Sequence, residues 1–238
     1  MIFERKHKIG IDEVNKNFKM TNESIITVFQ NLASFNSDAV GYGVLNVPKT
    51  GKTWVVVDWK LRVLRRPRYG ESVLVRTWGR NTEGLISLRD FEIRSDNELC
   101  AVATSKWMLI DLKTRKPIEI DEEIINAFGE HNEFEVFMDE EYEKIKPLEN
   151  YNKSKKINIR KSDLDFNNHV NNIKYFDYIS ELSENKNYND VRISYLKEIN
   201  EDEDVSIYLS EVGEVDHYLI KNSNDEIKTI IECKQTEY

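Results

Sequence analysis

The chain has 238 residues, 39% of them hydrophobic, and a formal net charge of −9 at pH 7. This apolar content supports a packed core, no apolar run approaches the ~20 residues of a membrane-spanning helix, and the negative charge argues against general nucleic-acid binding. Cys100 and Cys233 lie far apart, which argues against a disulfide framework or a thiolate metal site. Because no apolar signal segment opens the chain, we expect a cytoplasmic protein.

The first part of the chain predicts one long helix beside an antiparallel sheet. A strand over 2–9 is followed by a helix over 23–40, where apolar residues recur at helical spacing. Further strands are predicted over 53–65, 72–80, 86–95 and 99–111. Turn residues separate these strands, and alternation of side chains in the first of them indicates one buried face.

The stretch 112–150 is acidic and poor in apolar residues. We expect a short helix over 121–128 and then an acidic linker over 129–152. The chain would therefore divide into an N-terminal repeat, 1–128, and a C-terminal repeat, 153–238.

The second part repeats the order of the first. A strand over 154–160 precedes a helix that starts near residue 169 and runs to about 183, and strands follow at 190–199, 203–212, 215–222 and 226–236. A local register supports the repeat, because 96–99 (Asp-Asn-Glu-Leu) matches 224–227 (Asn-Asp-Glu-Ile). A helix wrapped by a curled antiparallel sheet, present twice, predicts an α+β fold of the double hot-dog type.

Residues 160–182 combine a turn rich in Asp and Asn with an apolar helical pattern that starts at Val170. His169 is therefore predicted in the first turn of a helix, where the positive end of the helix dipole favours a neutral imidazole and free N–H groups can hold an oxyanion. Asp165 and Asn167 on the incoming loop can orient the ring and a substrate. A capped helix with a surface histidine fits the same residues.

Two further features have both functional and ordinary interpretations. Glu198 ends the strand 190–199 and can supply a second carboxylate to the His169 site, although a surface glutamate at a strand end is the simpler interpretation. Arginines are dense between Lys60 and Arg94, and include Arg65, Arg66 and Arg68. They form either a basic face for an acidic partner or a set of cross-strand ion pairs.

The run 162–175, Ser-Asp-Leu-Asp-Phe-Asn-Asn-His-Val-Asn-Asn-Ile-Lys-Tyr, resembles the active-site motif of acyl-acyl-carrier-protein thioesterases. The resemblance extends to 69–71 (Tyr-Gly-Glu), 89–91 (Arg-Asp-Phe), 103–107 (Ala-Thr-Ser-Lys-Trp) and 195–198 (Tyr-Leu-Lys-Glu), and so spans nearly the whole chain. It implies hydrolysis of fatty acyl-carrier-protein thioesters with no cofactor and no metal.

Carried over residue by residue, the resemblance implies four catalytic residues, which are Asp165, Asn167, His169 and Glu198. Many plant members have a cysteine after the glutamate, but this chain has Ile199, so no thiol nucleophile is available there. Whether Asp165 or Glu198 activates the attack stays open.

The resemblance also implies that the first repeat shapes the acyl pocket. Candidate pocket residues on the predicted helix and first long strand are Phe29, Leu32, Ala33, Phe35, Val55, Val57 and Trp59. Because acyl carrier protein is acidic, the resemblance makes Arg65, Arg66 and Arg68 candidates for its docking.

Two rival functions fit the same fold. One is a hot-dog hydratase or dehydratase of acyl thioesters, and the other is a non-catalytic acyl-binding module. The sequence leaves open the preferred chain length, the choice between carrier protein and coenzyme A, and whether the protein is a monomer or a homodimer.

Overall fold

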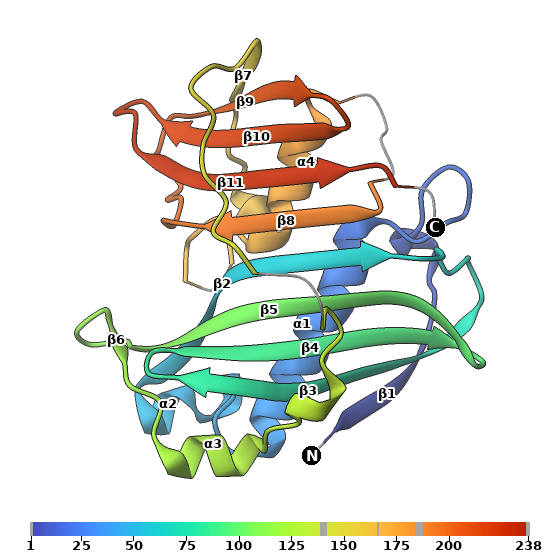
Figure 1. The fold of residues 1–238 in the computed structure, drawn as a ribbon. Helices are drawn as coiled ribbons and strands as arrows, with labels where there is room; N and C mark the ends of the chain where they lie inside the picture. The colour runs from blue at the N-terminus through green and yellow to red at the C-terminus, as the bar shows by residue number, and fades with distance from the viewer. Residues whose placement is uncertain (1, 139–141, 166, 184–187, 237–238) are drawn as a thin grey trace. The chain divides into compact units, whose positions relative to one another are not determined.

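The computed structural model describes residues 2–138, 142–165, 167–183 and 188–236. The chain forms two compact units, Met1–Glu141 and Tyr142–Tyr238. Figure 1 colours the first unit from blue to yellow-green and the second from yellow to red. In the part of the chain that is described, no helix is long and apolar enough to cross a membrane.

The first unit is one antiparallel sheet with a long helix on one face (Figure 1). Its strands lie in the order β1-β3-β4-β5-β2, and β6 pairs with β5. The elements are β1 (Phe3–Lys8), α1 (Asn22–Ala39), α2 (Val47–Thr50), β2 (Lys52–Val63), β3 (Ser72–Glu83), β4 (Ile86–Ser95), β5 (Glu98–Asp111), β6 (Lys116–Ile118) and α3 (Glu122–Phe128), with short 3-10 turns at Ile11–Glu13, Val44–Asn46 and Asn132–Phe134.

The sequence encodes α1 through a cap and an apolar stripe. The side chain of Thr21 accepts a hydrogen bond from Ser24 N (3.1 Å), which satisfies one of the free N–H groups at the helix start. Phe29 on the buried stripe packs against Phe91 of β4, with ring centroids 5.0 Å apart, and Phe91 contacts Trp59 of β2 at 5.1 Å. The helix is thereby fixed across the middle of the sheet.

The second unit repeats this arrangement with a shorter helix. Its sheet has the order β8-β11-β10-β9-β7, and all of its pairs are antiparallel. The elements are β7 (Lys153–Ile157), α4 (Tyr175–Ser180), β8 (Asp190–Tyr195), β9 (Val205–Val212), β10 (Val215–Asn222) and β11 (Ile227–Lys234), with 3-10 turns at Lys161–Asp163 and Asn172–Lys174.

Two predicted boundaries in the second unit are wrong. The helix begins with the 3-10 turn at Asn172, not near His169, because the side chain of Asn171 accepts the hydrogen bond from Ile173 N (3.1 Å) and so caps the turn. The strand expected over 190–199 ends at Tyr195, because the next residues form a bulge.

The stretch that we expected to be an acidic linker, 129–152, divides between the two units. Before the undescribed residues 139–141, Val136 N donates to Asp90 Oδ2 (3.1 Å) and Glu135 pairs with Arg80 (2.9 Å), so this part lies on the first sheet. After them, Ile145 packs with Leu219 and Ile230 of the second sheet. These contacts leave little of the stretch outside the units.

Candidate active site

The loop before α4 is a tight turn held by its own backbone. Leu164 and Val170 form an antiparallel bridge, and Asp165 N donates to His169 O (2.8 Å). At the tip, Asn168 has a φ of +60°, a left-handed conformation that asparagine tolerates better than most residues. The Asp- and Asn-rich run therefore forms the turn itself and does not cap the helix.

Asp165 organises this turn. Its Oδ1 accepts hydrogen bonds from Asn167 N (2.8 Å) and His169 N (3.2 Å). A side-chain oxygen that accepts from the backbone two residues ahead is the usual Asx-turn contact. One oxygen of the carboxylate is thus occupied in shaping the loop that presents His169.

His169 lies two residues before the cap Asn171 and is therefore outside the helix. The helix dipole therefore does not favour a neutral imidazole at His169, because its effect falls off within the first turn. For the same reason, helix N–H groups next to His169 do not form the predicted oxyanion site. The chemistry of the ring depends instead on the side chain next to it.

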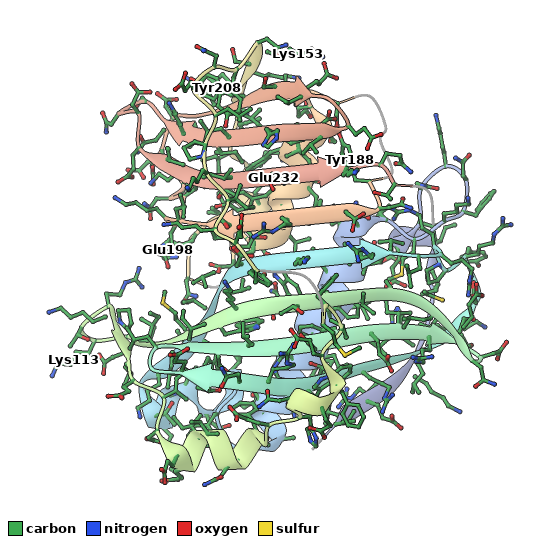
Figure 2. All side chains as sticks on the ribbon, in the orientation of Figure 1. Lys113, Lys153, Tyr188, Glu198, Tyr208 and Glu232 are labelled. Carbon is green, nitrogen blue, oxygen red and sulfur yellow. The ribbon has the colours of Figure 1, made fainter. Side chains whose placement is uncertain are left out.

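The side chain next to the His169 ring is Glu198. After β8 the chain bulges, because Leu196 N (2.8 Å) and Lys197 N (3.1 Å) both donate to the carbonyl of Lys228. The bulge sends Glu198 toward the turn, and His169 Nε2 lies 3.2 Å from Glu198 Oε2. In Figure 2 Glu198 stands just past the arrow tip of β8.

The two segments that carry this pair are also joined through their backbones. Val170 N donates to Ile199 O (2.9 Å), and His169 forms a bridge with Asn200. The His169 side chain is 13% exposed and the Glu198 side chain 54% exposed. A largely buried imidazole beside a solvent-accessible carboxylate can pass a proton to or from a small molecule such as water.

The turn after Glu198 is tied down by Glu203. This carboxylate accepts from Asn200 N (3.0 Å) and Asn200 Nδ2 (2.7 Å), and it pairs with the ammonium of Lys228 (2.6 Å). Burial alone would raise the pKa of Glu203, but Lys228 and the amide donors hold that pKa at about 2. The residue is therefore a fixed anion.

The first unit contains the same turn with different side chains. Val14 and Met20 form the bridge, Asn15 N donates to Lys19 O (2.9 Å), and Phe18 at the tip has a φ of +58°. Asn15 Oδ1 accepts from Asn17 N (2.9 Å) and Lys19 N (3.2 Å). Asn15, Asn17 and Lys19 thus occupy the places that Asp165, Asn167 and His169 have in the second unit.

The bulge is repeated as well. Leu64 N (2.9 Å) and Arg65 N (3.0 Å) both donate to the carbonyl of Cys100, and Lys19 forms a bridge with Arg68. By this register Arg66 takes the place of Glu198. The first unit therefore has two cations at the positions where the second has a histidine and a carboxylate, so this part of the first unit holds no equivalent acid–base pair.

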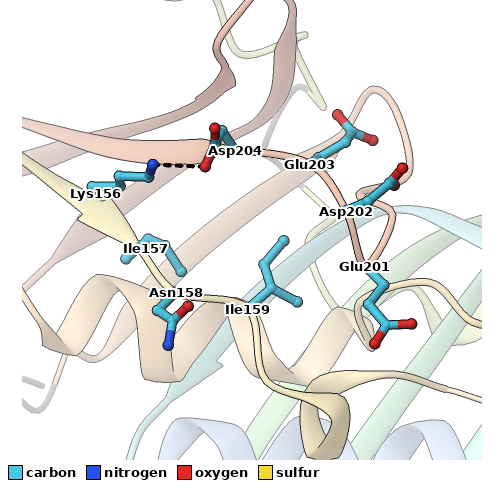
Figure 3. A pocket seen from close by; sticks show the side chains of 8 residues that line it. All are labelled: Lys156, Ile157, Asn158, Ile159, Glu201, Asp202, Glu203 and Asp204. Carbon is cyan, nitrogen blue, oxygen red and sulfur yellow. Dashed lines mark ion pairs between the residues drawn. The ribbon is translucent and has the colours of Figure 1, made fainter.

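A pocket opens in the second unit next to the turn that follows Glu198. It is lined by 156–159, at and after the end of β7, and by 201–204. Figure 3 shows the salt bridge between Lys156 and Asp204 (2.6 Å) at its side. His169 and Glu198 are not among its lining residues.

The predicted pocket residues of the first unit lie in different environments. Phe29, Leu32 and Trp59 are in the core, with exposed fractions of 0%, 3% and 0%, and Ala33 is also buried. Val55 is half-buried, and Val57 lies in a bulge of β2 that interrupts the alternation of faces. Phe35 is 43% exposed and lies under the guanidinium of Arg5 (4.2 Å), so it is outside the packed core.

Comparison with known proteins identifies the family. The model of the acyl-ACP thioesterase N-terminal domain matches residues 1–128, and that of the C-terminal domain matches residues 145–237. The chain belongs to the acyl-ACP thioesterase family.

Two curated relatives come from plants. Oleoyl-acyl carrier protein thioesterase 1 of Arabidopsis thaliana is 24% identical over 90% of this chain, and a palmitoyl-acyl carrier protein thioesterase of Cuphea hookeriana is 28% identical over 74%. The matches cover 65% and 44% of those proteins, so the chain spans about half to two thirds of the length of these relatives.

Solved structures confirm the predicted double hot-dog fold. An acyl-ACP thioesterase from Bacteroides thetaiotaomicron superimposes with a TM-score of 0.85, at 23% identity over 98% of this chain and 97% of that one. The 12:0-ACP thioesterase of Umbellularia californica superimposes with a TM-score of 0.83, at 21% identity over 98% and 96%.

The repeated turn predicts how the stability of this protein responds to acid. Glu71 pairs with Arg65 and Glu203 with Lys228, and both carboxyls have a pKa lowered from 4.5 to about 2. Lowered pKa values contribute stability that is complete above the unfolded value of 4.5 and is lost as the pH falls toward 2. Urea unfolding across this range should show a shallower loss of stability for Glu203→Gln and Glu71→Gln than for wild type. An unchanged slope in both variants would contradict the assigned ion pairs.

Proposed function

We propose that this protein hydrolyses the thioester of fatty acyl-acyl carrier protein and releases free fatty acid, which ends chain elongation. The observation that carries the proposal is the pair formed by His169 and Glu198, 3.2 Å apart although they are remote in sequence. Family membership supports the same reaction, since relatives are described as oleoyl- and palmitoyl-acyl carrier protein thioesterases. It favours hydrolysis over the hydratase and the acyl-binding alternatives.

In the proposed reaction, Glu198 and His169 take a proton from a water molecule, and the resulting hydroxide attacks the thioester carbonyl. The tetrahedral intermediate collapses, the carbon–sulfur bond breaks, and the carrier's thiolate leaves with the proton that the pair had taken. We assign Asn167 to orienting the carbonyl or the water, because its half-buried side-chain amide makes no hydrogen bond to the residues that the structure describes and so has donors and an acceptor to offer.

A second route has Asp165 attack the carbonyl directly, with hydrolysis of the resulting anhydride. The turn geometry favours the first route. One oxygen of Asp165 already accepts two backbone N–H groups, and Asn15, which has no nucleophilic oxygen, makes the same two contacts in the first unit. We therefore assign Asp165 to shaping the turn.

Docking of the acidic carrier protein is proposed at Arg68, because the other two candidate arginines already have partners within the protein. Arg65 pairs with Glu71 (2.6 Å) and Glu98 (2.6 Å). Arg66 donates to Met20 O (3.0 Å) and Asn22 Oδ1 (2.8 Å), and burial lowers its pKa to about 10.

Arg68 is exposed, and it lies opposite the exposed Lys19 in their backbone bridge. These two cations therefore form the centre of the proposed docking surface. The cytoplasmic location and the choice between monomer and homodimer stay predictions.

The central test is release of free fatty acid from a panel of acyl-acyl carrier proteins. His169→Ala and Glu198→Gln should each lower kcat by about 10²–10⁴-fold, the usual effect of removing a positioned acid or base. The control is Glu232→Gln, because Glu232 pairs with His217 (3.4 Å) in the same unit but away from the turn (Figure 2). Full activity in the folded His169 and Glu198 variants would refute the proposed site.

Asp165→Asn separates the two routes. Asparagine keeps the oxygen that accepts the two backbone N–H groups, as Asn15 does, but it cannot attack a carbonyl. We expect this variant to retain a rate within about tenfold of wild type, whereas Asp165→Ala loses the turn contacts, of about 1 kcal/mol each, and falls further. A rate as low for Asp165→Asn as for His169→Ala would show that Asp165 is the nucleophile.

Charge reversal tests docking. Arg68→Glu should raise KM for acyl-acyl carrier protein several-fold and leave KM for a short soluble thioester unchanged, because only the carrier protein brings negative charge to this surface. Lys113→Glu, an exposed lysine in the turn between β5 and β6, is the matched control. Equal changes with both substrates, or equal changes in both variants, would count against docking at Arg68.

A further inference from the structure

Lys228 on β11 is a buried cation in direct contact with the main chain of Glu198. It is 4% exposed, and its ammonium donates to the carbonyl of Glu198 (3.0 Å). The same ammonium pairs with Glu203 (2.6 Å) and Glu226 (2.8 Å). The carbonyl of this lysine also accepts the two amide groups of the bulge. Lys228 therefore holds the segment that carries Glu198 through its backbone and through its side chain.

The other member of the pair is connected to the same lysine. Glu203 accepts from the backbone N–H (3.0 Å) and the side-chain amide (2.7 Å) of Asn200. Asn200 in turn forms the bridge with His169. A chain of hydrogen bonds thus runs from Lys228 to the backbone of both residues, and a displacement of the lysine would change the distance between their side chains.

This network is costly to build. A buried ammonium loses its hydration, and only well-placed carboxylates compensate that loss. Although burial lowers the pKa of Lys228, its hydrogen bonds to Glu203 and Glu226 raise the pKa above the usual value, so the residue stays charged. Glu226 is shared with Lys197 of the bulge.

The first unit shows that the bulge itself does not need a lysine at this place. Cys100 has the position of Lys228, and its carbonyl accepts the two equivalent amide groups, Leu64 N and Arg65 N. The cation there is Arg65, which belongs to the bulge and pairs with Glu71 and Glu98. What distinguishes the second unit is a buried cation on the neighbouring strand that reaches the carbonyl of Glu198.

We propose that Lys228 is a positioning residue for thioester hydrolysis, which fixes the carboxylate of Glu198 and the imidazole of His169 at their working separation. The inference rests on the proposed function and adds a residue to it. Lys228 acts through the main chain of Glu198 and through Glu203, and it does not touch the substrate.

The test uses the full chain with a short soluble acyl thioester, so that carrier docking does not enter the kinetics. Lys228→Met has a similar length and no charge. We expect its kcat to fall about 10²-fold, the usual cost of a misplacement of about 1 Å, with KM nearly unchanged. Lys228→Arg keeps a cation and should recover part of the loss. A folded Lys228→Met with wild-type kcat, or no recovery in Lys228→Arg, would overturn the proposal.

Lys228→Met leaves two carboxylates without their cation, so it can fail to fold. In that case two matched variants, one in each unit, test the proposal. Glu203→Gln weakens the contact between Lys228 and Asn200, and Glu71→Gln makes the equivalent change in the first unit. Glu203→Gln should lower kcat while Glu71→Gln leaves it unchanged, at temperatures where circular dichroism shows both variants folded. Equal kcat values would assign the network to stability alone.

The wild-type protein and His169→Ala separate this inference from the proposed function. A wild type that releases no fatty acid contradicts the proposed function, and the role of Lys228 falls with it. Turnover that depends on His169 but is unaffected in the folded Lys228→Met would overturn only the role of Lys228.

Discussion

One carbonyl group, that of Lys228, determines where the acid–base pair forms. It accepts two successive amide groups, Leu196 N and Lys197 N, and so a regular strand cannot continue past Tyr195. An antiparallel strand alternates its side chains between two faces, and a bulge redirects the residue that follows it. Without the bulge Glu198 would follow the alternation of β8. With it, the carboxylate meets the ring of His169, whose own position is set by the turn that Asp165 closes.

The same backbone in the first unit shows that this geometry and its chemistry are separable. The turn is held by main-chain bonds and by one side-chain oxygen at position 15 or 165, which an amide or a carboxylate can supply equally. Two positions on this shared backbone carry different side chains without changing its shape. They are Lys19 and Arg66 in one unit, and His169 and Glu198 in the other. A repeated fold can therefore carry the proposed acid–base pair in one unit and two cationic side chains at the equivalent positions of the other.

Much of this arrangement could be predicted from the sequence, because it depends on local pattern. The periodicity of α1, the strands of both repeats and the Asp- and Asn-rich turn have direct signals, and resemblance identified the four candidate catalytic residues. The helix start was misplaced because Asp163–Asn168 and Asn171 are both plausible caps, and only the hydrogen bond to Ile173 N decides between them. The bulge left no signal, since it needs two amide groups to share a carbonyl on a strand about 30 residues away.

Long-range pairing also explains why the charge pattern alone did not show which arginines are paired and which is exposed. The arginines between Lys60 and Arg94 looked like one basic face, but Arg65 is neutralised by two carboxylates and the half-buried Arg66 is bonded to Asn22 at the start of α1. Their partners, Glu71, Glu98 and Asn22, come from three separate parts of the chain, so a local count of charge could not separate them from the exposed Arg68. The buried Lys228 was hidden for the same reason. Its sequence neighbours suggest an ordinary strand lysine, and its role becomes visible only when Glu203 and the carbonyl of Glu198 converge on it.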